Sequence, residues 1–255
     1  MNIVFIGAGN VATQLAIALK NVGENIVQIF SKTTESAKKL AIRVNSDFTD
    51  DITAINPNAD IYFYAVTDNV LPHLIKNISF CKGIHIHTAG SLAMEIFEKY
   101  QQNYGVLYPL QTISKNKEVD FQHIPFFIET SNNEVKEILL KITPKISKKI
   151  FFANSEERQR IHLAAVFACN FTNHMFSIAE NLLDDIPFEV LMPLITETIN
   201  KIKEIRPHEA QTGPAKRNDT DIIKKHLQLL ANNPVWQHLY QEISEDIINQ
   251  HKKQS

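Results

Sequence analysis

The feature that most constrains the fold is a run of small residues near the start of the chain, between an apolar segment and a helical pattern. Asn2–Ile6 is apolar and rich in β-branched residues, which predicts a buried strand. Gly7-Ala8-Gly9-Asn10-Val11-Ala12 follows at once, and apolar residues then recur at helical spacing from Gln14 to Lys20. A strand, a Gly-x-Gly-x-x-Ala turn and a helix are typical of the first unit of a dinucleotide-binding domain.

Each small residue of this motif has a physical role in such a domain. Gly7 permits the tight turn, Gly9 lets the backbone approach a pyrophosphate, and Ala12 lets the helix pack closely on the strand. The N–H groups and the dipole at the helix start favour the phosphates. We therefore expect Gly7, Gly9, Asn10 and Val11 to bind the cofactor. The alternative is a strand-to-helix turn that holds no ligand.

The end of the second predicted strand, Ile26–Phe30, indicates which dinucleotide is bound. In NAD-binding domains an acidic residue near this point accepts a hydrogen bond from the ribose 2′-hydroxyl. Here Ser31, Lys32 and Thr33 stand in its place, and the first acid is Glu35. Hydroxyl groups and a cation suit a 2′-phosphate, so the pattern predicts NADP bound by these three residues. Alternatively, the segment is a solvated loop that contains a lysine.

Length and composition narrow the class of protein. The chain has 255 residues, of which 44% are hydrophobic and 21% charged, as in soluble globular proteins of one large or two modest domains. A net charge of −2 gives no support to nucleic-acid or anionic-membrane binding. Cys81 and Cys169 form neither a disulfide framework nor a metal site, which suits a reducing compartment. Because Met1 leads directly into the first strand and no apolar run approaches twenty residues, we expect a cytoplasmic protein without a membrane partner.

Alternating strands and helices continue to residue 152. The carboxyl end of the strand predicted over 60–66 carries Val66, Thr67 and Asp68, which we expect to contact the cofactor because open α/β sheets bind ligands there. Ser91 is predicted to cap a helix over 92–100. The other predicted strands are 42–44, 83–87, 105–108, 124–129 and 148–152, and the other predicted helices 69–78 and 133–142.

Only helical patterns follow residue 153, which predicts two domains, 1–152 and 153–255. Asn154 and Glu157 form a capping-box pattern for a helix that runs to about Leu183. Further helices are expected from Pro187, with a kink at Pro193, and over 221–230 and 234–252, with a loop over 207–219. The predicted fold class is an α/β Rossmann-like domain with a mostly parallel, doubly wound sheet, followed by an all-α domain.

The long helix carries the candidate catalytic group. At 3.6 residues per turn, His162, Cys169 and Asn173 lie near one line, with Asn170 beside it. His162 titrates nearest neutrality and is the candidate general acid, with Asn170 and Ser91 as further catalytic candidates and Asn173 as a substrate contact. Alternatively, His162 only bonds within the protein.

Other polar residues are candidates for binding a substrate or a metal. Arg217, in the turn Thr212–Asp219, is a candidate ligand for a substrate carboxylate or phosphate, although this turn also suits a simple cap on the next helix. We expect no metal site, because four histidines lack ligand spacing and most of them are interpreted as surface or strand-end residues. They are His73, His85, His87 and His123.

The complete set of motifs resembles a bacterial family that joins a Rossmann-like NADP-binding domain to a helical domain of unassigned function. The wider clan is similar to pyrroline-5-carboxylate reductases, 6-phosphogluconate dehydrogenases and β-hydroxyacid dehydrogenases. The resemblance implies an NADP-dependent oxidoreductase with its active site between the two domains, commonly a dimer. One departure is that residues 154–183 contain no lysine, whereas the hydroxyacid dehydrogenases have a catalytic lysine on this helix. The segments that carry the likeness are Gly7–Ala12, His87–Ser91, Tyr108–Thr112, Arg160–His174 and Gln211–Asp219.

We therefore expect an NADP-dependent reductase of a small carbonyl or imine substrate. The alternatives are a deazaflavin-dependent NADP reductase and a non-catalytic NADP-binding sensor. A homodimer through the helical domain is also expected, because the long helix is apolar around most of its circumference and needs cover on nearly all sides. Its apolar residues include Leu163, Phe167, Phe171 and Met175, the last three of which are predicted to lie in the core.

Overall fold

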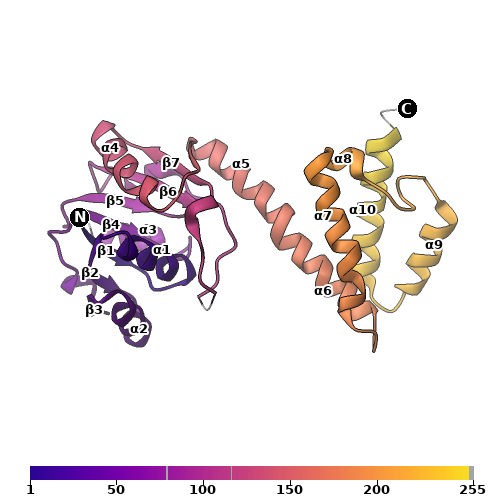
Figure 1. The fold of residues 1–255 in the computed structure, drawn as a ribbon, viewed down its shortest axis with the longest axis horizontal. Helices are drawn as coiled ribbons and strands as arrows, with labels where there is room; N and C mark the ends of the chain where they lie inside the picture. The colour runs from indigo at the N-terminus through magenta and orange to yellow at the C-terminus, as the bar shows by residue number, and fades with distance from the viewer. Residues whose placement is uncertain (79, 116, 253–255) are drawn as a thin grey trace. The chain divides into compact units, whose positions relative to one another are not determined.

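The computed structural model describes residues 1–78, 80–115 and 117–252. Contacts divide the chain into two compact units, Met1–Asn170 and Phe171–Ser255. The first contains the sheet and the second contains only helices (Figure 1). The domain division predicted between residues 152 and 153 stays a prediction; the helix that follows it, α5, belongs to the first compact unit.

Eight strands form one sheet in the order β3-β2-β1-β4-β5-β6-β7-β8. All neighbouring strands are parallel except β6 and β7, which are antiparallel. The predicted fold class, a mostly parallel Rossmann-like sheet followed by helices, is confirmed. The strands are β1 (Asn2–Ile6), β2 (Asn25–Phe30), β3 (Asp47–Thr49), β4 (Ile61–Tyr64), β5 (Ile84–His87), β6 (Tyr104–Pro109), β7 (Phe126–Thr130) and β8 (Ile150–Phe152).

The core lies on both faces of the sheet because successive strand residues point to opposite sides. In β1, Ile3 and Phe5 pack with α1 and α2, while Val4 and Ile6 pack into a second cluster that includes α3. An apolar strand buried on both faces is the pattern that the sequence of β1 indicates. The helices of this unit before residue 153 are α1 (Asn10–Asn21), α2 (Thr34–Val44), α3 (Leu71–Asn77) and α4 (Asn133–Ile142).

Two predicted elements of this unit are wrong. Residues 42–44 continue α2, because Leu40, Ala41 and Val44 are buried at helical spacing while Ile42 is exposed. The third strand comes later, after Asn45 ends α2 in the left-handed conformation.

Residues 92–100 form only a short 3₁₀ turn, Met94–Phe97. The Ser91 hydroxyl donates to Asp68 instead of capping a helix. The carbonyl of Leu92 is also taken, as an acceptor for Arg158.

The long predicted helix is present, with one irregularity. Asn154 and Glu157 form the expected capping box at the start of α5 (Ser155–Ala165). A π-helical segment, Val166–Phe171, separates α5 from α6 (Thr172–Leu182). The 3.6-residue repeat used to align His162 with Asn173 therefore fails between them, because a π segment has i→i+5 hydrogen bonds and a wider turn.

The remaining helices are mostly where the sequence predicts them. Pro193 lies in the first turn of α7 instead of inside a helix, so the expected kink is absent; this position suits proline because the N–H group it lacks has no partner there. The predicted loop over 207–219 contains one helical turn, α8. Across the described residues, no helix is long and apolar enough to cross a membrane. The helices are α7 (Met192–Glu204), α8 (Pro207–Ala210), α9 (Thr220–Leu229) and α10 (Pro234–Lys252).

Candidate functional site

The two glycines after β1 have different reasons to be glycine. Gly7 has φ +115°, and a Cβ there would lie 2.4 Å from the carbonyl oxygen of Ala65. Gly9 has an ordinary φ of −77°, and a Cβ there would meet only that oxygen, at 3.9 Å. The fold itself therefore requires glycine at position 7 but not at position 9. The open space beside Gly9 fits the close approach of a pyrophosphate.

The start of α1 suits an anion as well. No side chain caps this helix end, and its first turn contains no acidic residue. Its first N–H groups and its positive dipole are thus available to phosphates. The loop after β6 is tied to the same helix, because Asn10 Nδ2 donates to the Ile113 carbonyl at 2.9 Å and Gln14 Nε2 donates to the Ser114 carbonyl at 3.0 Å. The Tyr108–Thr112 segment is thereby connected to the helix that would hold the phosphates.

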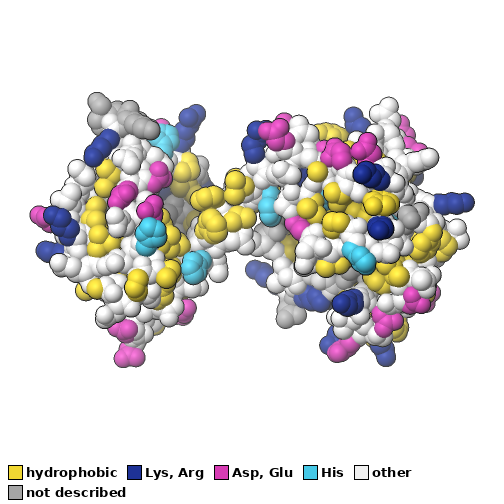
Figure 2. All heavy atoms as spheres, turned by 180° about the vertical axis from the view of Figure 1, so that it is seen from behind, with side chains coloured by type: hydrophobic (Ala, Val, Ile, Leu, Met, Phe, Trp, Pro, Cys, Tyr) yellow, Lys and Arg dark blue, Asp and Glu magenta, His cyan; other side chains and the backbone are white. Residues whose placement is uncertain are grey.

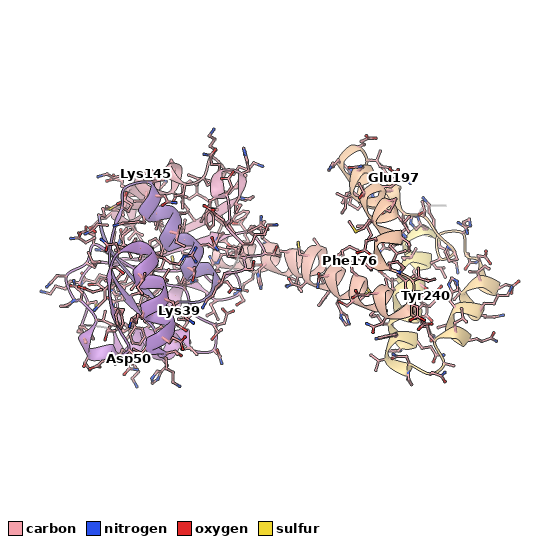
Figure 3. The ribbon with its side chains drawn as sticks, turned by 60° about the horizontal axis from the view of Figure 1, so that its bottom comes forward. Lys39, Asp50, Lys145, Phe176, Glu197 and Tyr240 are labelled. Atoms are coloured by element: carbon pink, nitrogen blue, oxygen red, sulfur yellow. The ribbon has the colours of Figure 1, made fainter. Side chains whose placement is uncertain are left out.

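The segment predicted to select NADP lies at the carboxyl end of β2. Lys32 and Thr33 are exposed, and the described part of the chain offers Lys32 no ion pair. The nearby acid Glu35 is paired with Lys39 one turn along α2, at 2.6 Å. Asp50 accepts a hydrogen bond from Thr34 (Figure 3 labels Lys39 and Asp50). The free cation at this strand end fits a 2′-phosphate.

The residues after β4 lie beside the glycine loop that follows β1. β2, which follows β1 in the sequence, pairs with one side of β1, and β4 pairs with the other side. The strand order therefore reverses between β1 and β4. Ligands of open α/β sheets bind at such a point. Val66 is half-buried, and Thr67 and Asp68 are exposed. Asp68 accepts the hydroxyl of Ser91, so two of the predicted site residues meet.

A tyrosine and a histidine meet near the carboxyl ends of β5 and β6. The Tyr108 hydroxyl lies 3.0 Å from His162 Nδ1, and the two rings are arranged edge to face, with centroids 5.9 Å apart. Gly90 makes this possible: a Cβ there would lie 2.7 Å from His162 Nδ1 and 2.8 Å from Tyr108 Cζ. The glycine of the His87–Ser91 segment is therefore needed for the pair to fit.

The first turn of α5 is fixed to the sheet by a buried ion pair. The Arg158 side chain is fully buried, pairs with Glu129 of β7, and also donates to the Leu92 carbonyl. The backbone N–H of Ser155 donates to the same glutamate at 2.8 Å. His162 is four residues after Arg158 and so lies on the same face of the helix. The anchor of Arg158 thus orients the imidazole toward β6.

The protonation of this pair follows from burial. Burial raises the pKa of Tyr108, against a smaller opposite effect of the Arg158 charge, so its phenol stays protonated. A phenol O–H that donates to Nδ1 leaves the proton of neutral His162 on Nε2. The structure gives Nε2 no hydrogen-bond partner among the described residues, and the ring is half-buried. Nε2 is thus an available donor.

His85 and His87 are not surface residues, because both side chains are fully buried in β5, of which His87 is the last residue. Burial lowers the pKa of His85 to about 4 and, together with the nearby Arg158 charge, that of His87 to about 3. Both imidazoles are thus neutral near pH 7. No group of three or more His, Cys, Asp or Glu residues that could hold a metal ion occurs in the described ranges.

Three further predicted residues, Asn170, Asn173 and Arg217, are exposed. Asn170 is exposed in the π segment, eight residues beyond His162. Asn173 and Arg217 are exposed residues of the helical unit. Phe167 and Phe171, predicted to lie in the core, are 62% and 47% exposed.

The sequence interpretation assigned no role to Tyr108, Gly90, Arg158 or Glu129. Two signals were available: Tyr108 begins the Tyr108–Thr112 motif, and Arg158 has the i, i+4 spacing to His162.

Comparisons with known proteins agree with this architecture. Residues 2–86 match the family model of coenzyme F420-dependent NADP oxidoreductases, and residues 124–247 match a domain of unknown function, DUF2520. A search of the curated proteins found no match.

Among solved structures, a Bacteroides fragilis protein provisionally named an NADP oxidoreductase is 45% identical, with a TM-score of 0.91; the alignment covers 97% of this chain and 98% of that one. Two more distant structures show the fold alone. An imine reductase from Myxococcus stipitatus in complex with NADP⁺ has 11% identity, coverage of 99% and 93%, and a TM-score of 0.67. A pyrroline-5-carboxylate reductase from Coxiella burnetii has 15% identity, coverage of 100% and 98%, and a TM-score of 0.57. The chain belongs to the family of NADP oxidoreductases that join an N-terminal NADP oxidoreductase domain to a C-terminal DUF2520 domain.

Proposed function

We propose that this oxidoreductase uses NADPH to reduce a small carbonyl or imine compound, with His162 as the proton donor. The observation that carries the proposal is the Tyr108–His162 pair near the carboxyl ends of β5 and β6. These strands belong to the same sheet as the phosphate loop after β1. Reduction of a C=O or C=N bond needs a proton donor beside the reacting atom.

Backbone and side-chain groups that follow the carboxyl ends of β1, β2 and β4 would hold the cofactor. The loop from Gly7 to Val11 would bind the pyrophosphate, and residues 31–33 the 2′-phosphate. Val66–Asp68 would line the cofactor at the point where the strand order reverses.

Side chains of the protein would transfer the proton and hold the proton donor in its orientation. Bound NADPH supplies the hydride. To act as the acid, His162 would carry a proton on both ring nitrogens. It would give the Nε2 proton to the oxygen or nitrogen of the substrate, so that an alcohol or amine leaves with NADP⁺ and a neutral imidazole remains. Tyr108 is hydrogen-bonded to the other ring nitrogen and so holds the imidazole in its orientation. An NADP⁺-bound imine reductase among the structural neighbours supports a C=N or C=O substrate.

The remaining predicted residues stay part of this proposal. Asn170 would contribute a catalytic amide, Asn173 and Arg217 would contact the substrate, and Ser91 would act with Asp68. The family model named for coenzyme F420 matches only residues 2–86, a range that lacks Tyr108 and His162. That match therefore bears on the nucleotide-binding half and not on the proton donor.

An isotope experiment tests the proposal. NADPH deuterated at C4 is incubated with the protein and a panel of small cyclic imines and ketones, and products are examined for deuterium by mass spectrometry. We expect transfer to at least one member. With His162→Ala, turnover should fall by roughly 10²–10⁴, the scale of a general acid, while NADPH affinity stays the same. Equal turnover of the two proteins would remove His162 from the reaction.

We also propose that the helical unit forms a homodimer. Only three of its described residues are buried, namely Ala215, Leu230 and Ser244. A unit with so small a core leaves much apolar surface exposed, and Figure 2 shows hydrophobic side chains gathered on its face. The exposed apolar residues of this unit include Leu182, Ile186, Val190, Leu194, Ile199 and Ile202.

Light scattering at micromolar concentration should give the mass of a dimer, about twice 29.1 kDa. Leu194→Glu should shift the mass toward the monomer, because Leu194 is 65% exposed on α7 and a charge there would oppose burial. Thr196→Glu adds the same charge two residues along the helix, on a different face, and serves as the control. A monomer mass for the unaltered protein would exclude the dimer.

A further inference from the structure

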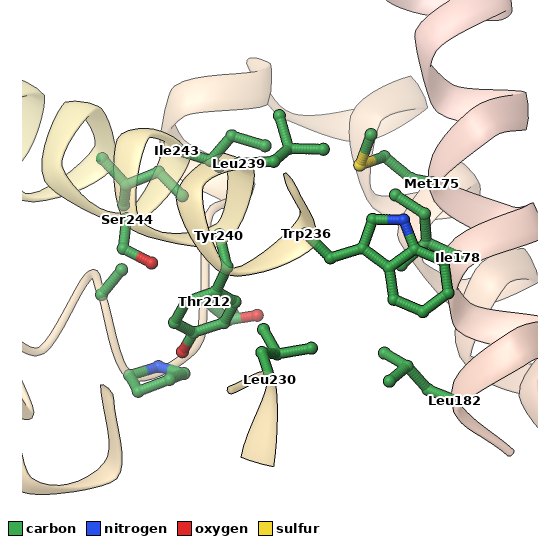
Figure 4. A pocket seen from close by; sticks show the side chains of 13 residues that line it. Met175, Ile178, Leu182, Thr212, Leu230, Trp236, Leu239, Tyr240, Ile243 and Ser244 are labelled. Carbon is green, nitrogen blue, oxygen red and sulfur yellow. The ribbon is translucent and has the colours of Figure 1, made fainter. Parts of the chain in front are cut away.

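The helical unit contains a cavity of about 260 Å³ between α6, α10 and the turn that begins at Thr212 (Figure 4). Its wall is mostly aliphatic, with two aromatic rings, and includes no charged side chain. An apolar cavity of roughly 150 Å³ holds benzene, so this one has room for a single substituted ring. The lining residues are Met175, Ile178, Leu182, Thr212, Pro214, Ala215, Leu230, Trp236, Leu239, Tyr240, Ile243, Ser244 and Ile247.

The two sides of the cavity differ in chemistry. Met175, Ile178 and Leu182 of α6 form one side together with the indole of Trp236, and Thr212 and Ser244 lie on the other side (Figure 4). One side therefore offers only apolar contacts, and the other adds hydroxyl groups. Such an arrangement, with apolar walls and few polar groups, is typical of small-molecule sites.

Ser244 is the second observation that points to a ligand. The residue is only 6% exposed and lines the cavity, and no hydrogen bond of its hydroxyl occurs among the described residues. This hydroxyl is therefore available to pair with a polar atom of a ligand in the cavity. Tyr240 differs, because its hydroxyl is already engaged with Nδ1 of His226 at 2.8 Å (Figure 3 labels Tyr240 and Phe176 of the same unit).

We propose that this cavity binds a small neutral molecule with one aromatic or branched apolar ring and one hydroxyl or carbonyl oxygen. The ring would lie against Trp236 and the aliphatic side chains of α6, and the oxygen would pair with Ser244. A charged ligand is excluded, because no opposite charge lines the cavity. This site lies in the helical unit and is independent of the proposed proton donor and cofactor loop.

The chain has a built-in reporter, because Trp236 is its only tryptophan. We would titrate the full-length protein with 3-bromobenzyl alcohol, whose bromine quenches a nearby indole, and follow tryptophan fluorescence. Saturable quenching that unbrominated benzyl alcohol reverses is expected. 3-Bromobenzoate, with the same ring and a negative charge, should quench much less.

Two variants and one control make the result specific. Ser244→Ala should weaken binding roughly three- to ten-fold, the scale of one hydrogen bond. Ala215→Leu should abolish saturable quenching by filling the cavity. Ser177→Ala, an exposed substitution on α6 outside the cavity, should leave the titration unchanged. Far-UV circular dichroism checks that each variant folds. If Ala215→Leu does not fold, the titration of Ser244→Ala tests the proposal.

Two outcomes would overturn the proposal. The first is linear, collisional quenching that is the same in the unaltered protein and in Ser244→Ala. The second is quenching that becomes saturable only when the protein is diluted to a monomer, which would assign the cavity to side chains of a second copy. NADPH binding, measured by cofactor fluorescence, should be equal in Ser244→Ala and the unaltered protein, so that failure here is separate from failure of the reductase proposal.

Discussion

The hydroxyl of Tyr108 and Nδ1 of His162 lie 3.0 Å apart, although 54 positions of sequence separate the two residues. The tyrosine ends a strand and the histidine lies in a helix that Arg158 anchors on the same sheet. The anchor and the absence of a Cβ at Gly90 bring the two rings together. This geometry holds one imidazole nitrogen and leaves the other available, which is what a proton donor needs.

Removing the Tyr108 hydroxyl should reduce turnover without loss of cofactor binding. Tyr108→Phe keeps the ring but leaves His162 Nδ1 without its hydrogen-bond partner, so the imidazole is held less firmly in its orientation. We expect turnover to fall roughly two- to ten-fold, the scale of one hydrogen bond, with a changed pH profile. Tyr104→Phe, in the same strand, is the matched control. If Tyr104→Phe and Tyr108→Phe give the same turnover and pH profile, the pair has no role in proton transfer.

Substitutions of the two glycines of the phosphate loop should have different effects. Gly9→Val should leave the melting temperature nearly unchanged, because φ is ordinary and a Cβ meets only one atom, at 3.9 Å. It should abolish NADPH binding, because the branched side chain takes the space of the pyrophosphate. Gly7→Val should unfold the protein, since its Cβ would lie 2.4 Å from a backbone oxygen. Thermal melting and cofactor fluorescence separate the two effects, and unimpaired NADPH binding by Gly9→Val would place the phosphates elsewhere.

The choice between NADPH and NADH should depend on Lys32. Lys32→Ala should weaken NADPH binding by about 1–3 kcal/mol, the value of a charge-assisted contact, and leave NADH unchanged. Lys39→Ala removes an equally exposed cation from the following helix, one that is already paired with Glu35, and should alter neither affinity. Calorimetric titration of both cofactors gives the answer. Equal affinity of the unaltered protein for NADPH and NADH would contradict the assignment of this segment.

Sequence patterns predicted most of the fold because its signals are local. The buried strand Asn2–Ile6, the glycine turn after it and the capping box at Asn154 each depend on neighbouring residues, and all are present. The errors occur where contacts with residues distant in the sequence determine the local structure. Ser91 does not cap a helix because Asp68, from another strand end, takes its hydroxyl.

The candidate site was only half accessible to sequence analysis. His162 was identified from its residue type, but its partner Tyr108 follows from the way β6 and α5 meet, which no local pattern encodes. The π segment after Ala165 is a second example: a helical wheel at constant turn cannot foresee it, and the predicted stripe from His162 to Asn173 depended on that constancy. The burial of His85 and His87 was missed because a polar residue in a strand usually points to solvent.

Those two buried histidines lead to a prediction about stability in acid. Burial lowers the pKa of His85 from 6.5 to about 4, against a smaller opposite effect of its hydrogen bond to the Cys81 carbonyl, and the Tyr64 hydroxyl lies 2.9 Å from its Nδ1. Burial also lowers the pKa of His87, to about 3. Below pH 6.5 the unfolded chain binds protons at both positions and the native chain does not, so the stability present above that pH is lost as the pH falls toward these native values.

The free energy of unfolding should decrease by about 1.4 kcal/mol per pH unit for each of these histidines. His85→Gln removes one titrating group, so the loss of stability between pH 7 and pH 5 should shrink by about 2 kcal/mol, whatever the variant costs at pH 7. Phe63→Leu is the matched control: Phe63 is fully buried in the other core cluster, where its ring stacks on Phe5 with centroids 5.2 Å apart, so its loss should lower stability equally at both pH values because no proton is involved. Guanidinium unfolding at the two pH values measures each difference. An unchanged pH dependence in His85→Gln would show that this imidazole is protonated in the native protein as readily as in the unfolded chain.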